Sequence, residues 1–181
     1  RYVEEFAEAR AQSQFLHWGI RFGLLLPLAA VYSLFGVSEW STIALPLLAS
    51  TASVVLLAQI GRRLFGWQAG LIAGTLYATF PLQLRYGSIL VPEPIAECFV
   101  LLGVLAYLEA VRRGVGWYLA AGAAVGCAYL TKEPALFVAP ALMLHAAWAR
   151  QWRGAILVAV GVTGIVAAEM TFYVAEHQDA M

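Results

Sequence analysis

Residues 41–63 read STIALPLLASTASVVLLAQIGRR, a long uncharged run closed by two arginines. A membrane-spanning helix needs about 20 consecutive, mostly apolar residues. The stretch from Ser41 to Ile60 meets this requirement, and Arg62 and Arg63 end it. Basic residues at the end of a span are typical of the cytoplasmic side of a membrane. This stretch therefore predicts a transmembrane helix and the side on which it ends.

The composition of the whole chain also favours a protein that lies in a bilayer. Of the 181 residues, 62% are hydrophobic and 12% are charged, whereas a soluble domain is about half apolar and about a quarter charged. The formal net charge is +0, which gives no argument for a nucleic-acid partner. The two cysteines lack CxxC spacing, so they indicate no metal site or disulfide framework.

Five further apolar stretches follow the first. Residues 20–35 are apolar too, but the stretch is short and contains Pro27, so it is either a further span or an interfacial or re-entrant helix. We therefore expect an all-α integral membrane protein, a multi-spanning bundle of about six to seven transmembrane helices. The predicted spans are Ser41–Ile60, Trp67–Leu84, Ile95–Val111, Gly116–Thr131, Ala135–Ala149 and Ala155–Ala175.

The two ends of the chain differ from this central region. The first 14 residues place Tyr2 and Phe6 on one face of a polar helix, which suits an outer-face juxtamembrane helix. We expect residues 1–40 to form outer-face juxtamembrane or re-entrant helices and residues 41–181 to form the transmembrane helical region. Because Arg1 opens the chain without an initiator Met or a signal sequence, we expect part of one larger membrane domain, truncated at both ends.

The short polar joints between the spans alternate in chemistry. Three carry arginines, and these hold 6 of the 11 lysines and arginines: Arg62, Arg63, Arg112, Arg113, Arg150 and Arg153. The joints between them, residues 85–94 (RYGSILVPEP) and 132–134 (KEP), carry carboxylates, prolines and a lysine. The positive-inside rule places the arginine joints in the cytoplasm and the other joints outside. Any chemistry is then expected on the outer face.

Lys132 and Glu133 form the sharpest local motif, at a corner between two apolar spans. An ammonium group at such a corner can neutralise a phosphate as a compact point charge. The same residues also suit an ordinary interfacial turn, in which the lysine reaches towards water and Pro134 starts the next helix. The residues alone leave both interpretations open.

Glu93 stands between two prolines where a span begins. A carboxylate there is stabilised by the helix dipole, but the flanking prolines also indicate a side chain held in a fixed place. Glu97 follows one turn deeper on the same face, and an ionisable group at that depth is a functional candidate. His145 is interpreted as a packed histidine.

Other features predict packing only. Glu109 lies near the inner end of its span and is expected to pair with Arg112 or Arg113. The small-residue faces at residues 70–74 (GLIAG) and 122–126 (GAAVG) let helices approach closely.

Four stretches together resemble a known family: RFGLLLPLAAVYSLFGVSEWS (21–41), GRRLFG (61–66), FPLQLRYGSILVPEP (80–94) and GAAVGCAYLTKEPALFVAPALML (122–144). They resemble the membrane region of C-type glycosyltransferases that use lipid-phosphate sugar donors. The chain is most similar to bacterial members of the protein mannosyltransferase and lipid A aminoarabinose transferase group. The resemblance covers nearly the whole chain.

The resemblance implies an inverting hexosyl or pentosyl transferase in the bacterial inner or plasma membrane, with its active face extracytoplasmic. The donor is a polyprenyl-phosphate-linked sugar, and the acceptor is a lipid, a glycan or a protein. Some relatives depend on a divalent cation, but the chain shows no spaced set of metal ligands. The implied catalytic residues are Glu93, Glu4 and Glu5, and the implied donor-phosphate-binding residues are Lys132, Arg85 and Glu133.

The chain departs from the family pattern at its start. The family's first-loop acid lies upstream of an aromatic position that Tyr2 matches, so it falls before Arg1, and the chain alone is then expected to be inactive. The main alternative is a fragment of a transporter or permease, although such proteins place ionisable groups near the membrane midplane. A scaffold subunit without chemistry is the third reading.

Overall fold

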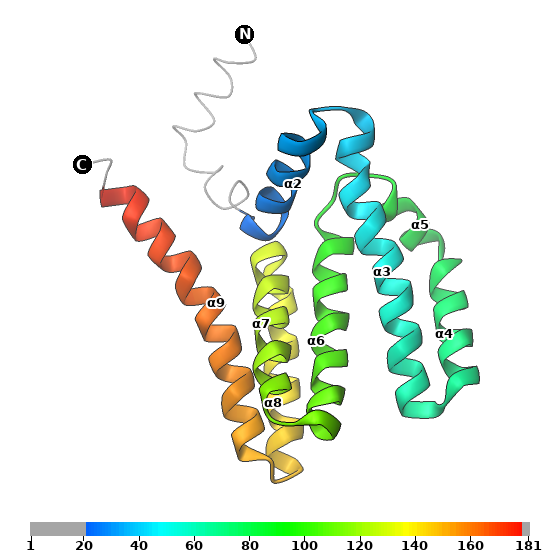
Figure 1. Cartoon of the computed structure of the whole chain (residues 1–181), viewed down its shortest axis with the longest axis vertical. Coiled ribbons are helices and arrows are strands. Elements are labelled where there is room, and N and C mark those ends of the chain that lie inside the picture. Colours follow the sequence, from blue (N-terminus) through cyan, green and yellow to red (C-terminus); the bar gives the residue numbers. More distant parts are fainter. Residues whose placement is uncertain (1–20, 179–181) are drawn as a thin grey trace.

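The computed structural model describes residues 21–178, and this part of the chain is helical with no strand (Figure 1). The prediction of an all-α protein is confirmed for these residues. The predicted helix within residues 1–14 lies outside them. The elements are α2 (Phe22–Phe35), α3 (Glu39–Phe65), α4 (Trp67–Ala78), α5 (Pro81–Gly87), α6 (Glu93–Arg113), α7 (Gly116–Thr131), the 3-10 helix η1 (Glu133–Phe137), α8 (Val138–Trp148) and α9 (Trp152–Gln178).

Three of the described helices are long and apolar enough to cross a membrane: Glu39–Phe65, Glu93–Arg113 and Trp152–Phe172. Their mean hydropathies of 2.0, 1.8 and 2.0 are those of membrane spans. An integral membrane protein is therefore supported, while the predicted total of six to seven spans stays a prediction.

The other predicted spans are shorter or interrupted helices. The stretch Trp67–Leu84 is divided, because Phe80 is extended (φ −68°, ψ 122°) before Pro81 starts α5. A residue before proline is disfavoured in the helical region, which explains the break. The stretch 135–149 begins as η1 and continues as the 11-residue helix α8. Helix α2 has 14 residues, about 21 Å at 1.5 Å per residue.

Successive helices are joined by short corners, and the charged joints lie at two opposite ends of the bundle (Figure 1). Gly66 (φ 95°) and Gly114 (φ 123°) make two of these corners, with a backbone conformation that other residues rarely adopt. We call the end with the arginine pairs of α3, α6 and the α8–α9 corner the arginine end. The opposite end, where α6 begins and α7 ends at Lys132, is the lysine end.

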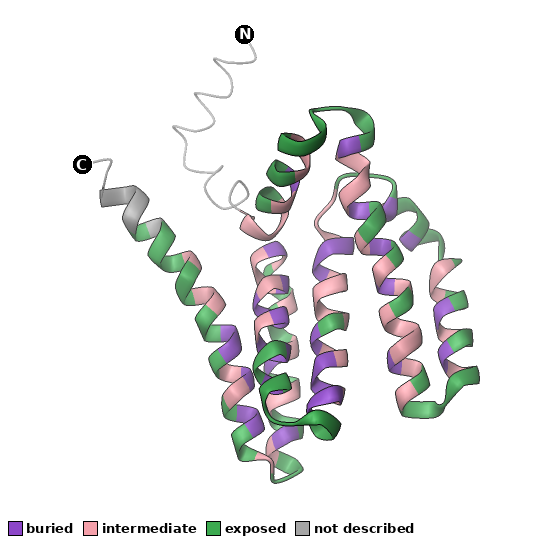
Figure 2. Cartoon of the chain, in the orientation of Figure 1, coloured by how far each residue is buried: buried purple, intermediate pink, exposed green. Residues whose placement is uncertain are grey.

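Close helix contacts follow the small-residue faces. A Cβ atom on Gly122 would lie 2.2 Å from the Val158 carbonyl oxygen of α9, and one on Gly70 would lie 2.4 Å from the Ala58 carbonyl oxygen of α3. Both faces therefore serve packing, as predicted. Helix α6 is the central span, with 44% of its most apolar window buried against 28% for α3 and 22% for α9. Figure 2 shows the exposed residues on the outer faces of α4 and α9, as suits contact with lipid.

Candidate functional site

Lys132 and Glu93 meet at the lysine end of the bundle. The Lys132 Nζ atom donates a hydrogen bond to Glu93 Oε1 at 2.7 Å, which joins the end of α7 to the start of α6. The side chains keep 38% and 32% of their surface exposed. The two residues singled out separately in the sequence therefore form one ion pair that solvent or a ligand can reach.

Local sequence explains why both side chains stand at this end. Pro92 and Pro94 flank Glu93 at the N-terminus of α6, where a proline needs no intrahelical partner. Lys132 ends α7 in an extended conformation (φ −153°, ψ 115°), and Pro134 lies in the first turn of η1. The break between α7 and η1 thus presents the ammonium group to α6.

A pocket of about 470 Å³ opens beside the ion pair, between α4, α5, α6 and the α7–η1 corner. Glu97 lines it one turn below Glu93, as expected from its i+4 position. The Tyr77 hydroxyl lies near Glu97 but makes no hydrogen bond of normal geometry with any described group. Gln83 is 5% exposed and donates to Ser50 Oγ at 2.8 Å. The polar lining residues are Tyr77, Gln83, Tyr86, Glu93, Glu97 and Lys132.

Helix α2 adds a cation that sequence reasoning missed. A Cβ atom on Gly23 would lie 2.2 Å from Thr131 Oγ1, so the start of α2 sits directly on the end of α7. Arg21, just before α2, is close enough for its charge to act on the Glu93 carboxylate. In the sequence, this contact was indicated only by Arg21 and Gly23 at the start of the apolar stretch that forms α2.

The remaining predicted site residues are not gathered in this pocket. Arg85 in α5 and Glu133 in η1 are exposed and do not line it. Glu4 and Glu5 lie outside the described residues. Within residues 21–178, no group of three or more His, Cys, Asp or Glu side chains can hold a metal ion.

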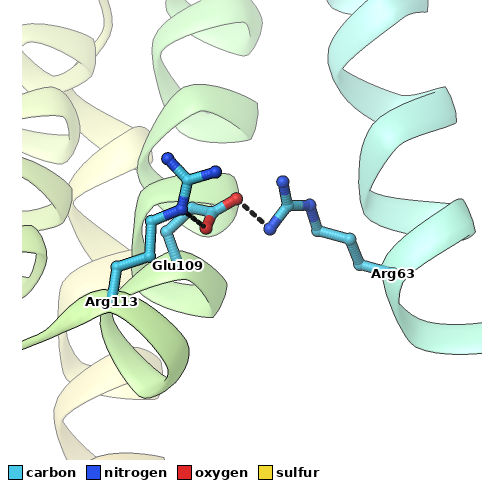
Figure 3. Close-up of polar contacts among 3 residues, drawn as sticks. All are labelled: Arg63, Glu109 and Arg113. Carbon is cyan, nitrogen blue, oxygen red and sulfur yellow. Dashed lines mark ion pairs between the residues drawn. The ribbon is translucent and has the colours of Figure 1, made fainter.

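The arginine end has a different kind of carboxylate contact (Figure 3). Glu109 accepts from Arg113 Nε at 2.9 Å and also pairs with Arg63 of α3, and only 8% of its side chain is exposed. The predicted pairing within α6 is found at Arg113, with Arg63 as a second partner. The interpretation of His145 as a packed histidine is wrong, because the residue is exposed; its Nδ1 atom lies 2.7 Å from the Tyr107 hydroxyl.

Comparisons with known proteins place the chain in a family. The family model for dolichyl-phosphate-mannose-protein mannosyltransferase matches residues 22–174, from α2 through most of α9. A lipid A galacturonosyltransferase, RgtD, from Rhizobium johnstonii is 31% identical over 149 residues. That alignment covers 77% of this chain and 30% of the relative, so the chain spans less than a third of that protein's length. No solved structure matches the chain.

The family match contains the Lys132–Glu93 pair and every lining residue of the adjacent pocket. It also covers more than half of the chain, and the apolar helices agree with a membrane family. The chain belongs to the dolichyl-phosphate-mannose-protein mannosyltransferase family of C-type membrane glycosyltransferases.

Proposed function

We propose that the protein containing this chain transfers a sugar from a polyprenyl-phosphate donor to an acceptor on the extracytoplasmic face of a bacterial inner membrane. The observation that carries the proposal is the Lys132–Glu93 pair, about one third exposed at the mouth of a pocket. The pair lies at the end opposite the arginine joints, which the positive-inside rule assigns to the cytoplasm. The relative that acts on lipid A favours a lipid as the acceptor among lipids, glycans and proteins.

In this proposal Lys132 binds the phosphate of the donor. An ammonium group is a compact point charge that can turn from one oxygen anion to another at little cost. The donor phosphate then replaces Glu93 as the partner of Lys132. Arg21 adds a second positive charge beside the same carboxylate, and we assign Arg85 and Glu133 to the rim of the site because both are exposed.

The transfer step forms one bond at the anomeric carbon of the sugar, breaks another and moves one proton. The acceptor hydroxyl oxygen bonds to the anomeric carbon from the face opposite the phosphate, which inverts the configuration. The carbon–oxygen bond to the phosphate breaks, and its electron pair leaves with the polyprenyl phosphate. Lys132 stabilises the negative charge that develops on this leaving group. The hydroxyl proton passes to a carboxylate within hydrogen-bond reach.

Glu93 is the carboxylate of the described chain that we assign to this proton. While Lys132 donates a hydrogen bond to it, the Glu93 carboxylate stays ionised. It could then accept a proton, but Lys132 occupies it. When the phosphate takes Lys132, the same carboxylate becomes free to accept the proton. Glu4 and Glu5 remain as the other candidates for this role.

The test is a transfer assay on the full-length protein in proteoliposomes, with a panel of polyprenyl-phosphate sugars as donors. We expect Lys132→Ala to lower the transfer rate by about 10²–10³-fold, the usual loss when one group that stabilises transition-state charge is removed. Glu93→Gln should lower it by a similar factor. Arg62→Ala is the matched control, because it removes an exposed cation from the arginine end.

Transfer that is indifferent to Lys132→Ala and Glu93→Gln would contradict the assignment of the site. No transfer with any donor, together with uptake of a solute into the vesicles, would favour a transporter instead. The fold of each variant is checked by its elution as a single species in detergent.

A further inference from the structure

A second and larger hollow lies at the arginine end, far along α6 from the candidate active site. Its volume is about 780 Å³, and it is formed by the end of α6, the start of α7 and the corner between α8 and α9. Four of the chain's 11 lysines and arginines line it: Arg112, Arg113, Arg150 and Arg153. We call it the arginine pocket.

Most of this positive charge is not neutralised by the described protein. Arg113 is paired with Glu109 at 2.9 Å. Within residues 21–178, Arg112, Arg150 and Arg153 form no ion pair with a carboxylate. Three guanidinium groups around one hollow repel one another unless an anion lies between them.

The backbone of the α8–α9 corner contains one residue in an unfavourable conformation. Arg150 has φ 57°, the one described residue other than glycine with a positive φ. Glycine or asparagine would adopt this conformation more easily. The corner is held by hydrogen bonds from the Arg150 N–H to the Ala147 carbonyl and from the Gln151 N–H to the Ala146 carbonyl, at 2.9 and 2.8 Å. This conformation is uncommon for an arginine, and it occurs here at a residue that lines the pocket.

The pocket also has a fixed wall and an aromatic rim. Tyr118 is 3% exposed, and its hydroxyl donates to Gln151 Oε1 of the same corner. A Cβ atom on Gly154 would lie 2.9 Å from the Tyr118 ring, so the start of α9 is pressed against this wall. Trp152 lines the pocket and is exposed, as is typical of a residue at the membrane–water interface.

We propose that the arginine pocket binds the phosphate of an anionic phospholipid from the membrane leaflet at that end. Guanidinium groups match phosphate oxygens in a bidentate geometry. Basic pockets between membrane helices on the cytoplasmic side are suited to anionic headgroups. The alternative is that the arginines act only as topology determinants, but that role needs neither a hollow nor the strained Arg150 corner. The proposal is independent of sugar transfer, because it concerns the opposite end of the bundle.

The experiment titrates the full-length protein in mild detergent with short-chain phosphatidylglycerol and counts bound lipids by native mass spectrometry. Phosphatidylcholine of the same chain length is the neutral-headgroup control. We expect one phosphatidylglycerol to bind saturably and Arg153→Gln to weaken it by about tenfold, equal to about 1.4 kcal/mol. Arg62→Gln removes the same charge from the same end but outside the pocket, and should leave binding unchanged.

A second variant separates the pocket from the overall charge of this end. Val115 lines the pocket and is 58% exposed, so Val115→Trp should fill the hollow, keep every arginine and also weaken lipid binding. Equal weakening by Arg153→Gln and Arg62→Gln, or normal binding by Val115→Trp, would overturn the proposal. Displacement of the lipid by an equal concentration of inorganic phosphate would overturn its source in the membrane.

Discussion

Helix α6 carries one paired carboxylate near each end, and the two pairs differ in their exposure and in their number of partners. Glu93 at the lysine end has one described ion-pair partner, Lys132, and 32% of its side chain is exposed. Glu109 at the arginine end is 8% exposed and pairs with two arginines, one of them from α3 (Figure 3). The first pair is open to exchange with a ligand, whereas the second is a closed clamp between helices.

The physical consequence is that the two pairs should respond to mutation in opposite ways. Removing one partner of a buried pair leaves an uncompensated charge and is strongly destabilising. An exposed pair is screened by water and contributes little to stability. The clamp at Glu109 should therefore affect the free energy of unfolding, and the Lys132–Glu93 pair should affect turnover.

The largest effect is expected at the clamp. Glu109→Gln should lower the free energy of unfolding by about 3 kcal/mol, because it leaves Arg63 without its buried carboxylate partner. The measurement is reversible unfolding of the full-length protein in mixed micelles. Arg113→Gln is the control and should cost less than about 1 kcal/mol, because this side chain is 62% exposed. Equal costs for the two variants would show that the clamp is not a buried interaction.

The next effect is expected where α2 meets the lysine end. Gly23→Ala should cost about 2 kcal/mol, the usual penalty for forcing extra volume into a packed contact. The added Cβ atom would lie 2.2 Å from Thr131 Oγ1 and 2.7 Å from its backbone nitrogen. Since α2 places Arg21 beside Glu93, transfer should fall as well. Gly36→Ala is unsuitable as a control because Gly36 has φ 73°, which would strain an alanine. The control is Ala29→Gly, on an exposed face of α2. Loss of stability without any loss of transfer would show that α2 plays no part in the site.

A smaller effect is expected from the Tyr107–His145 hydrogen bond, which lies in the half of the bundle near the arginine end. Tyr107→Phe keeps the ring, which packs against Tyr118 with 5.3 Å between centroids, and removes only the hydroxyl. The free energy of unfolding should fall by about 1 kcal/mol, the net value of a typical hydrogen bond. Transfer should be unchanged at a temperature where the variant is folded. A strong effect on transfer would contradict this account, because it would show that this hydrogen bond is coupled to the candidate site at the lysine end.

The smallest effect on stability is expected at the proposed site itself. Lys132→Met should change the free energy of unfolding by less than about 1 kcal/mol, because the pair is exposed to solvent. The same micelle unfolding experiment measures it, with Glu109→Gln as the reference. A cost as large as that of Glu109→Gln would make the Lys132–Glu93 pair a structural clamp like the one at the arginine end.

The sequence predicted the all-helical class and the separation of charged joints to two ends, because both depend on composition and on spacing along the chain. It also predicted that Gly70 and Gly122 serve packing, since small residues at every fourth position form a flat face on a helix. The division of the stretch 67–84 was missed. Apolar composition continues through Phe80 and Pro81, and only the restriction that proline imposes on the preceding residue breaks the helix there.

The candidate site was predicted in part. Lys132 and Glu93 were chosen from their prolines and their place at span ends, but their direct contact depends on how α6 and α7 pack. Arg21 was missed because its proximity depends on the Gly23 contact between α2 and α7. The pairing of Glu109 with Arg63 was missed for the same reason, since these residues are far apart in the sequence. For the candidate site, the residues were therefore predictable from local sequence, whereas their partners on other helices were not.

The most direct test of the central claim is the transfer rate of a charge-swapped protein, Glu93→Lys combined with Lys132→Glu, measured in proteoliposomes with the best donor of the panel. The swap keeps an ion pair between α6 and α7 but exchanges the positions of the cation and the carboxylate. If Lys132 binds the donor phosphate and Glu93 accepts the proton, the swapped protein should unfold like the wild type and still transfer at least about 10²-fold more slowly. Transfer at the wild-type rate would contradict this account, because it would show that the pair only holds the two helices together.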